Sequence, residues 1–281
     1  MAITDDISRS TTRIENNESN GSISTGTGFF WRFSEHPGDF WVVTNRHVLA
    51  EHKTLSVTFD LQLAPPKENV KSIIVTNENP NVIEHPDPTV DLAAIWLVPF
   101  AQSEINGTRP RIACITRENL ITEDFLNDLT AVEPVLMVGY PNGLYDEANN
   151  KPIVRSGITA TAAYRKYMGK RQFMIDCACY PGSSGSPVYI YRSNPWKSRS
   201  TGQLRMGVPP EAFAGVLFSG PFINQKGEIQ RFDGSPTDDK INVQSMMHLG
   251  HVIDAREILE MEDLAKDLIR EKWRSSGLEQ N

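Results

Sequence analysis

The sequence predicts an all-β protein, a barrel or a sandwich, with one helix at its C-terminal end. Many short segments rich in Val, Ile, Phe, Tyr and Thr follow one another, and Gly, Pro, Asn and Asp separate them. Between these segments only 116–131 has helical or irregular character, so the alternation that marks a parallel α/β sheet is missing. A length of 281 residues allows one large domain or two small ones.

The predicted strands follow each other from residue 28 to residue 249. They are Gly28–Phe33, Phe40–Thr44, Thr54–Asp60, Ser72–Thr76, Leu92–Val98, Pro134–Gly139, Ile153–Ala163, Gln172–Ala178, Pro187–Tyr191, Phe213–Ser219 and Ile241–Leu249. Residues 1 to about 20 are polar and charged, which predicts a mobile tail. The segment Tyr191–Glu211 is expected to be a long surface loop, either functional or a solvated insertion.

The last segment has the pattern of an amphipathic helix over residues 254–274. Asp254 can cap this helix, and the residues that follow form one largely apolar stripe: Ile258, Met261, Ala265, Leu268 and Lys272. We expect this helix to pack on the β body.

Composition and charge exclude several classes of protein. Hydrophobic residues make up 39 % and charged residues 22 %, which excludes wholesale disorder. The net charge of −7 argues against a protein whose main role is to bind nucleic acid or an anionic membrane. Three cysteines do not make a disulfide framework, and neither a transmembrane stretch nor an apolar signal peptide is visible. The expectation is a cytoplasmic protein.

The most informative segment is Asp176–Ile190, with the sequence DCACYPGSSGSPVYI. Its small residues predict a tight turn between two strands, with Ser184 at the centre and Ser183 as the nearest rival nucleophile. Small neighbours leave a hydroxyl approachable, and a sharp turn can aim successive backbone N–H groups into one space, as acyl transfer requires. The G-x-S-x-G elbow of α/β-hydrolases does not fit this spacing.

A base and an acid can be assigned to two further segments. His47 ends an apolar strand in FWVVTNRHVLA, and Asp91 opens a continuous apolar run in DPTVDLAAIWLV. A carboxylate at the start of a buried strand needs a partner such as an imidazole N–H. Asp87 is better explained as a turn former. A metal site made of His85, Asp87 and Asp91 is the weaker alternative, so we expect no metal and no cofactor.

The chain order His47, Asp91, Ser184 is that of chymotrypsin and differs from the orders in subtilisins and α/β-hydrolases. Together with this order, six sequence blocks resemble trypsin-like (chymotrypsin-fold) serine peptidases of the HtrA-like and V8-like branches, without a PDZ domain. The blocks span roughly residues 21–253 and are GTGFFW (Gly26–Trp31), WVVTNRHVLA (Trp41–Ala50), DLAAIWL (Asp91–Leu97), VGYPNGL (Val138–Leu144), DCACYPGSSGSPV (Asp176–Val188) and AGVLFSG (Ala214–Gly220).

This resemblance implies a role for each residue of the predicted triad. Ser184 would be the nucleophile, His47 the general base and Asp91 the group that orients His47. The N–H groups of Gly182 and Ser184 would form the oxyanion hole. Ser183 stands where digestive trypsins carry an Asp that pairs with a freed N-terminus, so we expect competence without N-terminal cleavage.

The resemblance also implies a substrate pocket and a preference. Ala178 would lie at the base of the S1 pocket, and its wall would be formed by Leu217, Phe218, Ser219 and Gly220. Ala178 argues against Arg or Lys before the scissile bond, and Leu217 argues against Glu. A small or apolar residue is therefore expected there, with Phe218–Gly220 pairing with an extended substrate strand.

The implied fold is two six-stranded antiparallel β-barrels, with the site between them. One peptidase domain is expected over residues 21–275, made of a first barrel at about 21–115, a second at about 130–253 and the helix at 254–274. The implied function is a cytoplasmic serine endopeptidase that acts on polypeptides through an acyl-enzyme and is controlled by a regulatory protein partner. The alternative is a catalytically silent pseudoprotease that serves as a protein-binding module.

Overall fold

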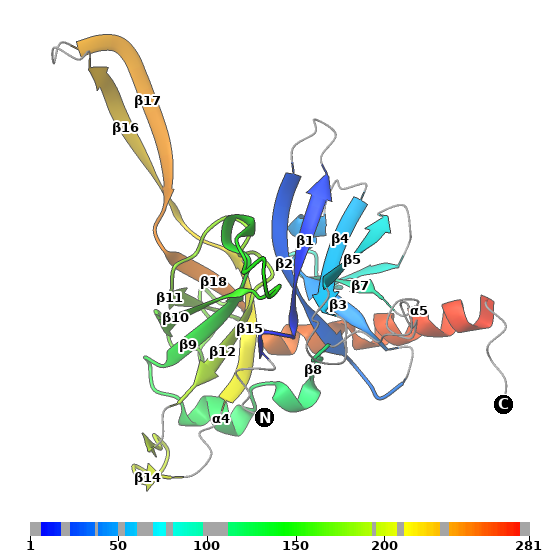
Figure 1. Ribbon diagram of the computed structural model, residues 1–281. Helices are drawn as coiled ribbons and strands as arrows, with labels where there is room; N and C mark the ends of the chain where they lie inside the picture. The colour runs from blue at the N-terminus through cyan, green and yellow to red at the C-terminus, as the bar shows by residue number, and fades with distance from the viewer. Residues whose placement is uncertain are drawn as a thin grey trace.

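The computed structural model describes residues 7–17, 23–36, 39–49, 54–60, 70–76, 81–97, 112–192, 195–206, 211–230 and 236–275. Within these ranges the chain forms two β structures side by side, and a helix follows them at the C-terminal end (Figure 1). The prediction of a mostly β, chymotrypsin-like two-barrel fold with a C-terminal helix is confirmed. None of the helices in the described ranges is both long enough and apolar enough to cross a membrane.

The first half is a sheet with the strand order β5-β4-β1-β2-β3-β7-β6, and a short strand β8 pairs in parallel with β2. Its buried side is built on large side chains of β2 and β3, among them Phe29, Phe30, Trp31 and Trp41, which are almost inaccessible to solvent. The strands are β1 (Thr11–Asn17), β2 (Ile23–Arg32), β3 (Trp41–Thr44), β4 (Thr54–Asp60), β5 (Val70–Thr76), β6 (Val82–Glu84), β7 (Ala93–Trp96) and β8 (Ile115–Thr116).

Strand β1 corrects the expected N-terminal tail. Residues 11–17 pair with β2 along the whole strand and with β4 over part of it, and Ile14 is fully buried. The sequence TTRIENN does not predict this strand, because Ile14 is its one large apolar residue. The other buried positions are occupied by threonines. The first β structure therefore begins near residue 11 and not at residue 21.

The second half closes into the predicted six-stranded barrel. Its strands pair antiparallel in the order β10-β11-β18-β15-β12-β9. The interior is filled by β-branched and other apolar side chains, including Val135, Met137, Ile175 and Val188. The strands are β9 (Pro134–Gly139), β10 (Ile153–Thr159), β11 (Gln172–Asp176), β12 (Pro187–Tyr191), β15 (Glu211–Ser219) and β18 (Leu249–Asp254).

A long hairpin interrupts the barrel between β15 and β18 and stands away from the body (Figure 1). It consists of β16 (Phe222–Gln230) and β17 (Pro236–Met246). The expected single strand Ile241–Leu249 is therefore divided between β17 and β18. His248 lies at the division with φ +60°, a left-handed conformation that a continuous strand does not contain.

The C-terminal helix lies where it was predicted, but its first turns form a 3₁₀ helix, which is narrower than an α-helix. A 3₁₀ helix η3 (Ala255–Met261) leads into α5 (Glu262–Ser275), and the Asp254 carboxylate accepts a hydrogen bond from the Arg256 N–H at 2.9 Å. The buried residues of this segment join the core of the first sheet: Ala255, Ile258, Met261, Ala265 and Ile269. The helix thereby packs on the β body as predicted.

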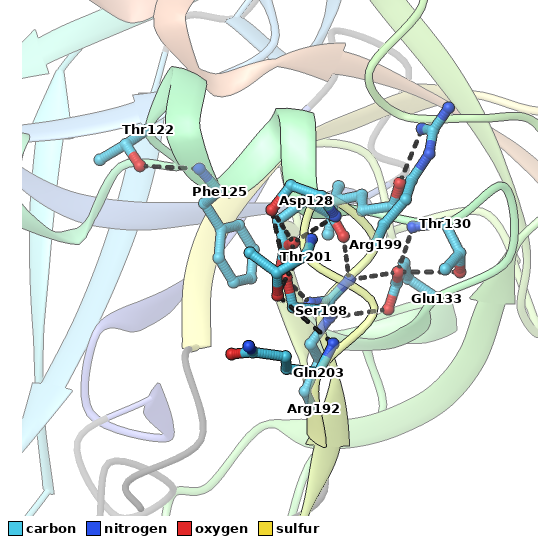
Figure 2. A network of polar contacts seen from close by, with 12 residues as sticks. Thr122, Phe125, Asp128, Thr130, Glu133, Arg192, Ser198, Arg199, Thr201 and Gln203 are labelled. Carbon is cyan, nitrogen blue, oxygen red and sulfur yellow. Dashed lines mark hydrogen bonds and ion pairs between the residues drawn. The ribbon is translucent and has the colours of Figure 1, made fainter. Parts of the chain in front are cut away.

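The segment after β12 is fastened to the connection between the two halves (Figure 2). That connection contains η1 (Arg117–Asn119) and α4 (Glu123–Asp128). Buried Arg192 forms ion pairs with Asp128 at 2.9 Å and with Glu133 at 2.6 Å, and Ser198 donates to Asp128 at 2.7 Å. Two short paired strands follow, β13 (Trp196–Lys197) and β14 (Leu204–Arg205). Ion pairs thus hold the described part of the expected loop against the connection between the two halves.

Candidate active site

The predicted base and acid lie together in the first half. His47 belongs to a single helical turn, α2 (Arg46–Leu49), that follows β3, and Asp91 directly precedes β7. The His47 Nδ1 atom lies 2.5 Å from Asp91 Oδ2, and the His47 backbone N–H donates to Oδ1 at 3.0 Å. Partial burial favours a higher pKa for Asp91, but these hydrogen bonds and the charge of Arg46 outweigh it and lower the pKa. Asp91 therefore stays ionised.

The loop that carries Asp91 is held by two neighbours of His47. Asn45 donates its amide to the Asp91 carbonyl at 2.9 Å, and the Arg46 guanidinium donates to the carbonyls of His85 and Pro88. These contacts fix the spacing between β3 and β7 at the point where the pair forms.

Asp87, the other acidic residue of this loop, has the contacts of a turn former. The exposed Asp87 carboxylate accepts the Thr89 N–H at 2.8 Å, as expected of a turn former. Across the residues that the structure describes, no group of three or more His, Cys, Asp or Glu side chains is arranged to hold a metal ion.

The predicted nucleophile lies in the turn between β11 and β12. The turn is held from both halves: the Gly185 N–H donates to the Leu217 carbonyl, and the Thr27 N–H of β2 donates to the Ser184 carbonyl, each at 2.8 Å. Gly185 has φ +86°, and a Cβ placed there would lie 1.8 Å from the Thr27 carbonyl oxygen. The close approach of β2 therefore requires glycine at this position.

Ser183 and Ser184 have different surroundings. Ser183 is fully buried, and its hydroxyl is bonded within the protein, whereas Ser184 is partly exposed and lines a pocket with His47. These surroundings favour Ser184 over Ser183 as the approachable hydroxyl. No hydrogen bond joins Ser184 and His47 in the described structure. Such bonds are often long in unliganded enzymes.

The two predicted oxyanion donors have no internal acceptor. Among the described backbone hydrogen bonds, the N–H groups of Gly182 and Ser184 donate to no other group. The Pro181 carbonyl accepts the Asn142 N–H at 2.6 Å, from the 3₁₀ turn η2 (Pro141–Gly143). Because the C=O and N–H of a trans peptide point in opposite directions, this contact turns the Gly182 N–H away from η2.

The pocket beside Ser184 has a volume of about 260 Å³ and an apolar lining. Four of the five predicted specificity residues line it, namely Leu217, Phe218, Ser219 and Gly220, and Ala178 lies outside the lining. The remaining lining residues are His47, Cys179, Tyr180, Pro181, Phe222 and Met246. Phe222 and Met246 come from the base of the hairpin, which the sequence analysis did not identify.

The outer wall of the pocket is an irregular stretch of β15. The pairing of β15 with β18 shifts between Leu217 and Ser219, which is a β-bulge at Phe218. A second hollow of about 450 Å³ shares Phe218 and Ser219 and reaches Asp91 and His251. The Ser219 hydroxyl lies 3.1 Å from His251 Nδ1. The two hollows therefore adjoin at Phe218 and Ser219, one lined by His47 and the other by Asp91.

Thr27 is a positioning residue that the sequence analysis missed. Its hydroxyl donates to the Gly182 carbonyl at 2.9 Å and accepts the Tyr140 N–H at 3.1 Å, and its own carbonyl accepts the Thr44 hydroxyl at 2.7 Å. Thr27 thereby connects strands of the first sheet to the nucleophile turn of the second barrel. The only sequence feature that could have pointed to Thr27 is its position within the family-like block GTGFFW.

The cysteines near the turn are buried free thiols. Burial raises the pKa of Cys177, and it raises the pKa of Cys179 to about 12. A thiol that stays protonated is a poor nucleophile, which leaves Ser184 as the candidate nucleophile in this pocket.

Comparison with known families agrees with this architecture. The family model for the trypsin-like peptidase domain matches residues 26–193, which is more than half of the chain. The chain therefore belongs to the trypsin-like peptidase family, as the sequence blocks predicted. No curated protein sequence matches the chain.

Several similar solved structures are distant in sequence. They include an HtrA-type protease with a tripeptide, the Rv3671c protease from M. tuberculosis in its active form, and a serine endoprotease from Yersinia pestis. Their identities are 16 %, 16 % and 15 %, with TM-scores of 0.48, 0.43 and 0.48. The matches cover 92 %, 92 % and 94 % of this chain, and 61 %, 81 % and 65 % of those chains. The chain thus spans less than two thirds of the first and third of these proteins.

Proposed function

We propose that the chain is a serine endopeptidase with Ser184 as nucleophile, His47 as general base and Asp91 as the group that orients His47. The observation that carries this proposal is the 2.5 Å contact between His47 Nδ1 and Asp91, at a pocket that both His47 and Ser184 line. The ionised Asp91 holds the proton on Nδ1 and so leaves Nε2 free to accept a proton.

In the proposed reaction the Ser184 hydroxyl oxygen attacks the carbonyl carbon of the scissile peptide bond, and its proton passes to His47 Nε2. The negative charge that develops on the carbonyl oxygen is stabilised by the N–H groups of Gly182 and Ser184. The tetrahedral intermediate collapses, the C–N bond breaks, and His47 returns the proton to the leaving amine. Water then repeats the sequence on the acyl-enzyme and releases the acid product.

The pocket favours an apolar residue before the scissile bond. Its side walls are formed by Leu217, Phe218, Phe222 and Met246, and its described lining contains no Asp, Glu, Lys or Arg. An Arg, Lys or Glu side chain would be desolvated there without a partner of opposite charge. A second hollow, which shares Phe218 and Ser219 with this pocket, supports binding of an extended polypeptide strand on this side.

Control by a regulatory protein partner and a cytoplasmic location remain part of the proposal. Three free cysteines are typical of a reducing compartment. Co-purification of a partner that raises or lowers the peptidase activity would support control. Full activity of the isolated chain, with no partner recovered, would count against it.

The test is hydrolysis of a peptide library by the purified full chain, with Ser184→Ala and His47→Ala as variants. We expect cleavage after apolar residues in the wild type and a loss of several orders of magnitude in both variants. The binding-module alternative predicts that the folded wild type and the variants all leave every peptide intact. Near-normal cleavage by His47→Ala would overturn the assignment of the base.

A further inference from the structure

Arg155 is partly buried and places a cation directly behind the nucleophile turn. It lies on β10, opposite Met137 of β9, and its Nη1 atom donates to the Ala178 carbonyl at 2.7 Å and to the Ser183 hydroxyl at 2.8 Å. The other two guanidinium nitrogens, Nε and Nη2, are buried and have no hydrogen-bond partner among the residues that the structure describes. In the part of the chain that the structure describes, no carboxylate forms an ion pair with Arg155.

This arrangement is unfavourable as a purely structural device. A buried charge is normally matched by an opposite charge, and an unmatched one reduces stability. Arg192 of the same barrel shows the ordinary solution, because Asp128 and Glu133 both bind its guanidinium. The position of Arg155 therefore calls for an explanation other than stability.

The two acceptors of Arg155 span the segment that builds the oxyanion hole. Ala178 begins the approach to the turn, and Ser183 lies between Gly182 and Ser184, whose N–H groups are the proposed donors. Ser183 is also bonded at its backbone: its N–H donates to the Tyr180 carbonyl, and its carbonyl accepts from Ser186, both at 3.0 Å. A group that fixes the Ser183 hydroxyl thus fixes the orientation of the peptide units on either side.

We propose that Arg155 is the positioning residue that holds the oxyanion hole in its working shape, by binding the Ala178 carbonyl and the Ser183 hydroxyl from inside the barrel. This inference rests on the proposed peptidase function of Ser184. In digestive members this position is an Asp, which pairs with the cationic N-terminus freed by cleavage. In this chain the position is Ser183, and its hydroxyl binds the cation of Arg155, a residue already within the fold. The hole then forms on folding and needs no cleavage.

The test compares Arg155→Met and Arg155→Lys with Arg192→Met. Arg192 is a buried arginine of the same barrel that does not line the pocket. For Arg155→Met we expect kcat to fall about 10²-fold, the effect of losing one oxyanion donor, with a much smaller change in KM. Arg155→Lys should recover part of this loss, and Arg192→Met should keep the wild-type kcat. The affinity for a peptide aldehyde, which binds as an oxyanion, should fall in parallel with kcat.

Several results would overturn the inference. Wild-type kcat and aldehyde affinity in a folded Arg155→Met would remove Arg155 from the site while leaving the proposed function intact. A wild-type chain that neither cleaves peptides nor reacts with an active-serine probe would overturn both. If Arg155→Met does not fold, Ser183→Ala decides: it removes one acceptor, so it should lower kcat in the same direction by a smaller factor, and an unchanged kcat would contradict the inference.

Discussion

Two arginines of the second barrel, buried Arg192 and partly buried Arg155, are held in opposite ways. Arg192 is bound by the carboxylates of Asp128 and Glu133 and fastens the segment after β12 to α4 (Figure 2). Arg155 is bound by a carbonyl and a hydroxyl and lies behind the nucleophile turn. The charge of Arg192 is balanced within the fold, whereas Arg155 has no carboxylate partner among the described residues, as expected of the role in positioning the turn that we propose for it.

The nucleophile turn and the loop next to Arg192 each contain a glycine with positive φ, and these glycines differ in the space around them. Both Gly185 and Gly202 have positive φ, at +86° and +69°. A Cβ on Gly185 would lie 1.8 Å from the Thr27 carbonyl oxygen, whereas a Cβ on Gly202 would meet nothing within 4 Å. The nucleophile turn is therefore tightly enclosed, and the loop that Arg192 anchors has space around it.

The largest effect is expected from Gly185→Ala. The added methyl group would force the turn away from Thr27 and displace Ser184, so we expect a loss in kcat/KM of at least about 10²-fold, as for loss of an oxyanion donor. Gly202→Ala is the matched control and should cost only the left-handed backbone strain of about 1 kcal/mol, at unchanged activity. Equal kcat/KM values in the two variants would contradict the claim that the nucleophile turn is more tightly enclosed than the loop that contains Gly202.

Arg192→Met should mainly change stability. Removing the guanidinium leaves two poorly exposed carboxylates without a partner of opposite charge, which we expect to lower the free energy of unfolding by about 3–5 kcal/mol. Urea unfolding, with kcat measured in parallel, checks this. A variant with normal stability and reduced kcat would reverse the roles that we assign to the two arginines.

Thr27→Val should weaken the contact between the two halves at the turn. The nearly isosteric change removes the hydroxyl that binds the Gly182 carbonyl and the Tyr140 N–H, both buried, at an expected cost of about 1–3 kcal/mol. We also expect a lower kcat, because Gly182 carries an oxyanion donor. Thr27→Ser keeps the hydroxyl and should retain most of the activity; identical kcat losses in both variants would show that the methyl group matters instead.

The smallest effect is expected in the acid stability of the Arg192 region. Burial favours a higher pKa for Asp128, but hydrogen bonds from Ser198, Ser200 and Arg192 outweigh it, and the pKa is lowered. Because the native pKa lies below the unfolded value of about 3.9, the stabilisation by Asp128 is present above that pH and is lost as pH falls through the native pKa. Asp128→Asn should therefore show a shallower loss of stability below about pH 4. An unchanged slope would contradict the assignment.

Local sequence patterns predicted much of the fold and of the pocket. His47 and Asp91 stand at the ends of apolar strands, and Ser184 stands in a turn of small residues, so each gives a signal within its own segment. The closed second barrel and the pocket residues were expected from the resemblance to trypsin-like peptidases, since the strands alone allowed a barrel or a sandwich. Strand β1 was missed because only Ile14 marks it, and β16 was missed because NQKGEIQ lacks an apolar alternation.

Local sequence patterns could not predict contacts between residues that lie far apart in the sequence. Thr27 acts on Gly182 across 155 positions in the sequence, and Arg155 reaches Ser183 across 28. Neither residue has a distinctive neighbourhood, since a Thr and an Arg within strands are common. Their roles come from the tertiary packing of the two halves, which no local periodicity encodes.

The most direct test of the account is the site of reaction with a fluorophosphonate probe, located by mass spectrometry of the digested chain. We predict one adduct, on Ser184, in the wild type, none in Ser184→Ala, and a slower adduct at the same residue in Ser183→Ala. An adduct on Ser183 or at another position, or no adduct on the folded wild-type chain, would contradict the assignment of Ser184 as the nucleophile.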